Sequence, residues 1–278
     1  MKLFVDNLTH VDFSYLHPKR GLVGESWAVQ LVLDGSLDPQ GMICDFGVVK
    51  RRVKQWLDAH LDHMLAVPAQ TPGLHIDQQG GMTEVRWHYP GGDLFRCRSP
   101  EQAIAALPCT AIDELSVAHW CRDQLRQLFP EQVQGVELAF TTESIEGHYY
   151  HYSHGLQQHE GNCQRIAHGH RSRIMIYRNG HRDEGLEGRW AECFRDIYIG
   201  TRAHLQDKSE GMHRYAYSAP QGEFELELPA RCCYLIDTES TVEQIAAHLA
   251  QQIRLDHPQD EIVVRAFEGI GKGAIAIA

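Results

Sequence analysis

Residues 148–170, HYYHYSHGLQQHEGNCQRIAHGH, decide which fold and which chemistry are expected of this chain. They hold six of its eighteen histidines and one cysteine, Cys163. The last three, His168-Gly169-His170, lead into an apolar run at residues 174–177 that is typical of a strand. Residues two apart on a strand point to the same face, so His168 and His170 can both reach one point in space.

A third histidine, His154, follows an alternating apolar and polar run at residues 150–153. Three imidazoles with one coordination position left open are the pattern of a catalytic zinc site, so we predict Zn²⁺ on His154, His168 and His170. The nearby charge of the metal would favour the thiolate of Cys163. The alternative interpretation is that these histidines are exposed polar surface or hydrogen-bonded core groups.

The composition is that of a soluble globular protein. The 278 residues suffice for one large domain or two ordinary ones, and 43% are hydrophobic, 9% aromatic and 23% charged. The formal net charge of −11 argues against a general nucleic-acid surface, which needs clustered lysine and arginine.

The location predicted from the sequence is the cytoplasm. No apolar run reaches the length of a membrane span, and the first residues, MKLFVDNLTH, lack the core of a signal peptide. The eight cysteines are scattered without a C-x-x-C pair, as expected for reduced thiols in a chain without an export signal.

Hydrophobic periodicity gives the first half the order strand, strand, helix, hairpin, helix, strand. The predicted elements are strands at 3–16 and 27–33, a helix from 46 to about 62, a loop at 66–82, a hairpin at 84–96, a helix capped by Asp113 and a strand at 135–140. The second half repeats this order faintly, with a late helix at 242–253 and a last strand at 261–267. We therefore divide the chain into residues 1–145 and 146–278.

The repeat is supported by several short segments that are similar in the two halves and occur in the same order. The matched segments are 13–17 with 150–154, Gly24-Glu25 with Gly169-His170, 59–63 with 203–207, and 136–141 with 263–268. The two halves have different residues at three of these positions. The first half has residues 23–25 where the second has His168-Gly169-His170, and Asp62-His63 where the second has Gln206-Asp207. It also has Thr141 where the second has Glu268. The first half is therefore expected to have lost its metal site, and a complete site needs residues of both halves.

These motifs resemble the 6-pyruvoyltetrahydropterin synthase and 6-carboxytetrahydropterin synthase family. The family pattern combines F-S-x-x-H, a cysteine before H-G-H, G-M-x-x-D-F, L-D-H and a closing V-x-x-x-E. The matching residues are Gly41–Phe46 and Leu61-Asp62-His63 in the first half, and 150–154, Cys163, His168-Gly169-His170 and Glu268 in the second. Taken as two fused units, the resemblance covers nearly the whole chain.

The resemblance implies an α+β fold of two tandem T-fold units. Each unit would be an antiparallel four-stranded sheet with two helices on one face. Such units associate edge to edge into barrels whose active sites lie between neighbours, so a homo-oligomer is expected. Open sheet edges that need partners agree with this expectation.

The resemblance also implies a zinc-dependent carbon–oxygen lyase acting on 7,8-dihydroneopterin triphosphate. Zn²⁺ would be held by His154, His168 and His170, Cys163 would act as general acid and base, Asp62 and His63 would complete a proton relay, and Glu268 would anchor the pterin ring. In a host that makes queuosine, the carboxy-forming reaction is the one expected.

Two alternative functions remain open at this stage. Cys163 lies five positions before His168, where the family usually has four, and a bulge would be needed to aim the thiol. If the thiol is misaimed, the chain is a non-catalytic pterin- or purine-binding protein. Nitrile reductase relatives also fuse two T-fold units, but their Glu-Ser-Lys-rich motif is not found here. The basic run at residues 50–52 is interpreted as a solvated helix face rather than a triphosphate clamp.

Overall fold

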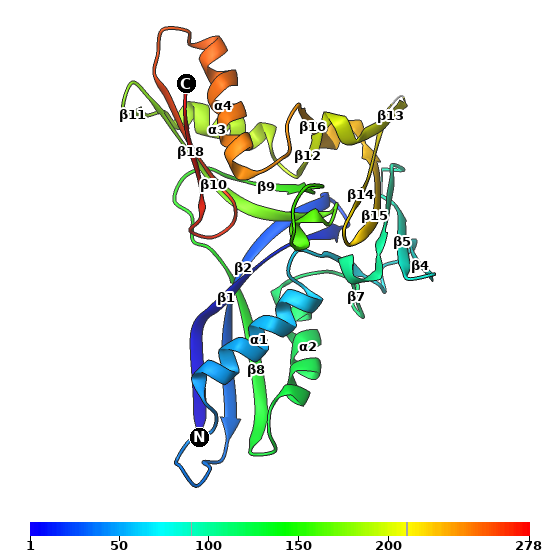
Figure 1. The fold of residues 1–278 in the computed structure, drawn as a ribbon, viewed down its shortest axis with the longest axis vertical. Helices are drawn as coiled ribbons and strands as arrows, with labels where there is room; N and C mark the ends of the chain where they lie inside the picture. Colours follow the sequence, from blue (N-terminus) through cyan, green and yellow to red (C-terminus); the bar gives the residue numbers. More distant parts are fainter. Residues whose placement is uncertain (90, 210) are drawn as a thin grey trace.

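The structure is a computed structural model that describes residues 1–89, 91–209 and 211–278. Two halves of similar make-up lie end to end, with the two chain termini at opposite ends of the molecule (Figure 1). The expected mixture of helices and sheets is confirmed. Among the residues just given, no helix is long and apolar enough to cross a membrane.

The first half is built on the long antiparallel hairpin of β1 (Lys2–His17) and β2 (Gly21–Gly35). Its sheet has the order β7-β3-β1-β2-β8, with β3 (Leu65–Pro68), β7 (Ile104–Leu107) and β8 (Val133–Thr142). The helices α1 (Phe46–His60) and α2 (Glu114–Leu125) lie along one face of it (Figure 1).

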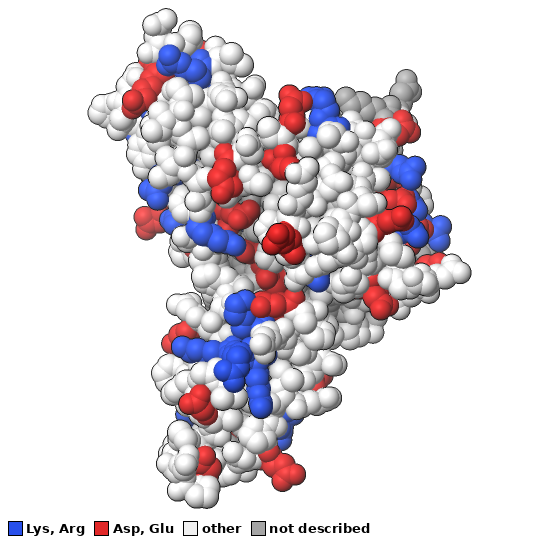
Figure 2. Space-filling model, viewed as in Figure 1, with Lys and Arg blue, Asp and Glu red and all other residues white. Residues whose placement is uncertain are grey.

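Both helices of the first half begin where the sequence predicts. The Asp45 side chain accepts a hydrogen bond from the backbone of Val48, and Asp113 forms a capping box with Ser116. The apolar stripe of α1, including Val53 and Leu57, is buried in one core with the inward side chains of the sheet. On its other side α1 exposes the basic residues predicted to be solvated, and Figure 2 shows Lys and Arg gathered there.

The second half has the same order of elements with two short additions. Its main sheet runs β16-β12-β9-β10-β17-β18, and β11 pairs with β10. The strands are β9 (Tyr149–His154), β10 (His168–Arg178), β11 (His181–Arg182), β12 (Ile197–Thr201), β16 (Cys233–Ile236), β17 (Ile262–Phe267) and β18 (Gly273–Ile277). The helices α3 (Glu184–Cys193) and α4 (Val242–Asp256) pack with them around a second core.

A third sheet joins the halves. It has the order β13-β14-β15-β6-β5-β4, with β4 (Leu74–Gln79), β5 (Met82–His88), β6 (Leu94–Pro100), β13 (Leu205–Ser209), β14 (Met212–Ala219) and β15 (Gly222–Pro229). Strand β15 of one half pairs with β6 of the other, and Arg96 forms ion pairs with Glu84 at 2.6 Å and Glu225 at 3.0 Å. Short 3₁₀ helices complete the chain at Glu101–Ala103, Arg126–Leu128, Asn162–Gln164, Arg202–His204 and Ala230–Cys232.

The structure corrects the expected sheets in number and direction. Instead of four antiparallel strands in each half, the three sheets have five, seven and six strands. Strands β3, β7, β12 and β16 pair in parallel, because a helix or a hairpin crosses over before each of them. The loop expected at 66–82 contains β4 and most of β3, and the hairpin expected at 84–96 is confirmed as β5 and β6. Its turn residue Pro90 lies outside the described residues.

The hairpin β1–β2 crosses the hairpin β9–β10 in the middle of the molecule (Figure 1). Two glycines make this close approach possible. A Cβ atom on Gly24 would lie 1.9 Å from the backbone oxygen of Tyr152, and one on Gly169 would lie 2.7 Å from Oγ of Ser14 and 2.8 Å from Cα of Gly24. Any side chain at either position would therefore force the two halves apart.

Strand pairing around this crossing fixes which residues of the halves occupy matching positions. Ser14 pairs with the first crossing glycine and Ser153 with the second, and their hydroxyls lie 2.7 Å apart. Counting along the strands from these pairs, Tyr15 is the residue of the first half that occupies the position of His154. The sequence comparison instead aligned His154 with His17, two residues further along. The echo misplaces this position because the loop between β1 and β2 is much shorter than the loop between β9 and β10.

Two further echoes are wrong in register. Ser14 pairs with Leu65 and Ser153 with Tyr198, so Arg195-Asp196 occupies the place of Asp62-His63. Both Asp196 and His63 have a positive φ, 53° and 56°, whereas Gln206-Asp207 belongs to the third sheet. By the same counting along β8 and β17, Thr142 rather than Thr141 matches Glu268.

Candidate metal and proton-transfer site

Three histidines of the second half converge at the crossing. His154 ends β9 and pairs in register with His168, the first residue of β10, while His170 follows on the same face. One nitrogen from each lies within 4.8 Å of the others, and the Nε2 atoms of His154 and His170 are 3.2 Å apart. All three side chains are buried. The structure thus brings together the three residues predicted as metal ligands.

The hydrogen bonds of His154 and His168 fix which nitrogen of each ring carries the proton. Nδ1 of His154 lies 2.8 Å from the backbone oxygen of Ser240, and Nδ1 of His168 lies 2.8 Å from that of Arg165. Because a carbonyl accepts, each Nδ1 carries the proton and each Nε2 has a lone pair. Nε2 of His168 is buried without a hydrogen-bond partner, which is unfavourable unless a ligand fills the space.

The buried rings are also in the right charge state for a metal. Burial lowers the pKa of both His154 and His168 well below its usual range, and the neighbouring histidines lower it further. Metal ions bind neutral imidazole, so no proton has to be displaced from these two ligands. The donor set, its burial and the unpartnered nitrogen all fit a metal such as zinc.

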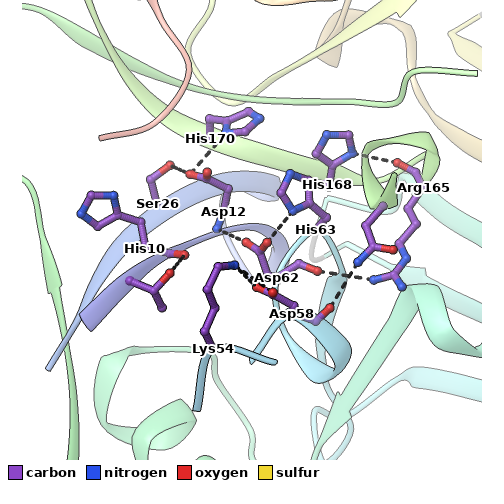
Figure 3. Close-up of polar contacts among 12 residues, drawn as sticks. His10, Asp12, Ser26, Lys54, Asp58, Asp62, His63, Arg165, His168 and His170 are labelled. Carbon is purple, nitrogen blue, oxygen red and sulfur yellow. Dashed lines mark hydrogen bonds and ion pairs between the residues drawn. The ribbon is translucent and has the colours of Figure 1, made fainter. Parts of the chain in front are cut away.

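The first half contributes Asp62 and His63, the residues predicted to form a proton relay, to the same place. His63 follows α1, and its Nδ1 lies 2.7 Å from Oδ2 of Asp62. On the other side of the ring, the ligand atoms of His63, Cys163 and His168 lie within 4.8 Å of one another. Figure 3 shows Asp62 and His63 directed from the first half toward the histidines of β10.

Cys163 reaches the relay without a bulge in either strand. It lies in the 3₁₀ helix Asn162–Gln164, and its backbone oxygen accepts a hydrogen bond from Leu156. The pairing of β9 with β10 runs without a register shift. The 3₁₀ turn in the loop therefore accommodates the extra residue before His168.

His63 can hold a proton beside the thiol. Burial lowers the pKa of His63, but the hydrogen bonds and charges of Asp62 and Cys163 outweigh it and raise the pKa to about 10. A histidine oriented by a carboxylate and in contact with a cysteine is suited to general acid–base chemistry.

Glu268 lies at the rim of the site, just after β17. Its Oε1 is 3.9 Å from Nε2 of His170, and its side chain is 24% exposed. The turn that follows is closed by a hydrogen bond from the Glu268 backbone nitrogen to the oxygen of Lys272. A carboxylate in this position can accept hydrogen bonds from a ligand that enters beside the histidines.

A sequence comparison decides the family. Residues 7–145, half of the chain, match the family described as 6-pyruvoyl tetrahydropterin synthase. The chain belongs to this family. The matched residues include Asp62 and His63, while the three histidines lie beyond the match. Family membership supports a pterin substrate and an activity of the tetrahydropterin synthase type, in a family that is typically metal-dependent.

Solved structures of the family are distant from this chain. The 6-pyruvoyltetrahydropterin synthase of Plasmodium vivax is 19% identical, with 52% of this chain and 91% of that chain covered and a TM-score of 0.42. The enzyme of Plasmodium falciparum is 16% identical, with 51% and 90% covered and a TM-score of 0.42. At these values the likeness carries no argument about the site, and family membership rests on the sequence match. No curated protein matches the chain.

Sequence reasoning missed the residues that contact the candidate site residues directly or through Asp12. These are Asp12 and Ser26 of the first half and Arg165, Ser240 and Lys272 of the second. A signal existed for Asp12, since an acidic residue interrupts the apolar stretch Val11–Leu16 of a predicted strand. Its partners come from strands far away in sequence, and no local pattern indicates them.

The position in the first half that matches the histidine cluster has a different chemistry. Tyr15, Val23 and Glu25 stand there, and Glu25 Oε2 lies 3.8 Å from Nδ1 of His151 across the crossing. Burial raises the pKa of Glu25 to about 7, and burial together with Arg20 lowers the pKa of His151 to about 4. None of Tyr15, Val23 and Glu25 carries an imidazole, and the loss of a metal site from this half stays a prediction.

The buried Glu25 carboxyl makes stability depend on pH. Because its folded-state pKa lies above its ordinary value of 4.5, its stabilising contribution is present below about pH 4.5 and is lost as the pH rises through about 7. We expect Glu25→Gln to match the wild type at pH 4.5 and to exceed its unfolding free energy by about 3 kcal/mol at pH 8.5.

Urea unfolding of both proteins across this pH range measures the difference, in which the His151 contribution largely cancels. The exposed Glu131→Gln variant is the matched control and should show no such pH trend. A Glu25→Gln gain that is equal at pH 4.5 and pH 8.5 would contradict the raised pKa.

Proposed function

We propose that the chain is a fusion of two T-fold units, residues 1–145 and 146–278, with one active site at their crossing. We further propose that this site is a zinc-dependent lyase of the 6-pyruvoyl- or 6-carboxytetrahydropterin synthase type that acts on 7,8-dihydroneopterin triphosphate. The observation that carries the proposal is the meeting of Asp62 and His63 from one half with Cys163 and the histidine cluster from the other.

The division into two units is supported by the order of elements. Each half runs strand, strand, helix, strand, three hairpin strands, strand, helix, strand, and only β11 and β18 are extra in the second. Each half also has its own buried core beneath its own pair of helices. The close approach at Gly24 and Gly169 supports a shared site rather than two independent ones.

In the proposed mechanism His154, His168 and His170 would hold Zn²⁺ through their Nε2 atoms. The bound metal would act as a Lewis acid that polarises the hydroxyl or carbonyl of the substrate side chain. Cys163 and His63 would then move protons between carbon and oxygen atoms of that side chain, so that triphosphate can leave. Asp62 keeps the His63 ring oriented through the 2.7 Å contact at Nδ1.

Glu268 would set the position of the pterin. Its carboxylate would accept two hydrogen bonds from the guanidine-like edge of the ring, a charge-assisted pairing. With its Oε1 3.9 Å from Nε2 of His170, it would hold the ring at the rim and direct the side chain inward to the metal.

We also propose a homo-oligomer formed through open sheet edges. Strands β8 and β18 each lie at the end of a sheet, and β18 exposes Ile275 at 63% and Ile277 at 70%. An unpaired apolar edge strand is a ready surface for pairing with another chain.

The proposed reaction is tested by incubating the zinc-loaded protein with 7,8-dihydroneopterin triphosphate. Release of inorganic triphosphate together with a new reduced pterin, identified by mass, supports the lyase. The mass also distinguishes the pyruvoyl from the carboxy product. Binding of the pterin without any triphosphate release contradicts the lyase and favours a binding protein.

We expect Glu268→Gln to weaken pterin binding by 10- to 100-fold, because a neutral amide replaces a charge-assisted acceptor worth about 1.5–3 kcal/mol. Isothermal titration with neopterin measures this loss. Glu261→Gln, at the opposite end of β17, is the matched control and should bind as the wild type does. Equal neopterin affinity in both variants would remove Glu268 from the pterin site.

A further inference from the structure

A buried carboxylate of the first half reaches the histidine cluster of the second. Asp12 on β1 is only 4% exposed, and its Oδ1 lies 3.3 Å from Nδ1 of His170. Ser26 donates its hydroxyl to the same oxygen at 2.5 Å, and the ammonium of Lys272 lies 3.0 Å from Oδ2. A hydroxyl, an ammonium and an imidazole therefore surround the carboxylate, and Figure 3 shows Ser26 and His170 beside it.

The backbone of the same residue holds the proton relay. The Asp12 nitrogen donates to Oδ1 of Asp62 at 2.7 Å, and the Asp12 oxygen accepts from the nitrogen of His63 at 2.6 Å. One residue of β1 thus touches a predicted metal ligand through its side chain and both relay residues through its main chain.

The Nδ1 atom of His170 differs from that of the other two histidines in its contacts. Its two companions in the cluster direct Nδ1 at backbone carbonyls, whereas Nδ1 of His170 is buried without a hydrogen bond. Oδ1 of Asp12 faces it at a distance of 3.3 Å. A carboxylate at Nδ1 fixes the tautomer of a histidine ligand and strengthens donation from its Nε2.

We infer that Asp12 is a positioning residue of the metal site, supplied by the first half, which presents Nε2 of His170 to the metal. This inference deepens the proposed function and rests on its metal site. It makes metal binding, as well as proton transfer, depend on both halves. The fused chain would then lose metal affinity when the contact between Asp12 and His170 is removed.

The chain contains a natural control for this contact. Across the same crossing Glu25 on β2 faces His151 on β9, so a carboxylate of the first half again meets an imidazole of the second. There the imidazole Nδ1 lies 2.8 Å from the oxygen of Gly24, and Tyr15 and Val23 stand where two ligands would be. The two pairs are similar in burial and chemistry, but only the Asp12 pair includes a residue of the histidine cluster.

The test compares Asp12→Asn with Glu25→Gln in the full chain. Zinc affinity is measured by competition with a chromophoric chelator, and the Co²⁺ complex is examined by its visible absorption bands. We expect Asp12→Asn to bind zinc 10- to 100-fold more weakly and to shift the Co²⁺ bands, because a ligand of altered basicity changes the metal environment. Glu25→Gln should retain the affinity and the spectrum of the wild type.

The outcomes separate this inference from the proposed function. A wild-type chain that binds neither metal contradicts the metal site itself. Tight wild-type binding with equal affinity and spectra in both variants overturns the role of Asp12 alone. If Asp12→Asn does not fold, Ser26→Ala keeps the carboxylate but releases its Oδ1, and the same shift of the Co²⁺ bands is expected. An unchanged spectrum in that variant would assign Asp12 to folding only.

Discussion

A His168→Ala/His170→Ala variant should be purified without zinc, whereas the wild type should hold about one zinc per chain. The double change removes two of the three converging nitrogens and leaves His154 alone, which cannot hold the ion against competing water and buffer. Elemental analysis of the purified proteins measures the ratio. Triphosphate release by the proposed lyase should disappear with the metal.

The matched control removes two other histidines of the same stretch. His148 and His159 are exposed and lie outside the cluster, so the variant His148→Ala/His159→Ala should keep its zinc. Two metals per chain would contradict the assignment of Tyr15, Val23 and Glu25 to a position without a metal. No metal in the wild type, even after reconstitution with zinc, would contradict the metal site.

The strand period alone predicted the spacing of the cluster. The alternation of side chains puts His168 and His170 on one face, and the antiparallel pairing of β9 with β10 places His154 opposite His168. The capped starts of α1 and α2 were equally predictable, because Asp45 and Asp113 satisfy backbone groups a few residues away. These are local rules, and the structure follows them.

Short similar sequences in the two halves did not predict which of their residues occupy equivalent positions in the fold. The echo of residues 13–17 in 150–154 is offset by two from the strand pairing, because the loops that follow β1 and β9 differ in length. The place of His63 is likewise taken by Asp196, which forms an ion pair with Arg20 across the halves at 2.5 Å. The second half therefore has the ion pair of Asp196 with Arg20 at the position that corresponds to His63.

Contacts between distant strands explain the remaining differences. The third sheet exists because β6 and β15, from different halves, pair edge to edge. The contact of Asp12 with His170 spans the crossing in the same way. Neither follows from periodicity, since each joins strands that belong to different halves of the chain.

Replacing Cys163 by alanine should lower triphosphate release by 10²- to 10⁴-fold, the range expected when a general acid–base group is lost. Zinc content and neopterin affinity should not change, because the three proposed zinc ligands and Glu268 are all retained. His63→Ala should have a similar effect. Since the two residues would act as one unit, the double variant should be little worse than either single variant. Steady-state rates for the four proteins measure this.

The exposed Cys193→Ala variant is the matched control and should retain the wild-type rate. The three possible results have different meanings for the site. Unchanged turnover in Cys163→Ala would remove the thiol from the mechanism and leave His63 as the proton-transfer group. Losses that multiply in the double variant would mean that Cys163 and His63 act separately. If the zinc-loaded wild type binds neopterin but shows no turnover, the result would favour a pterin-binding protein in which Cys163 and His63 have no catalytic role.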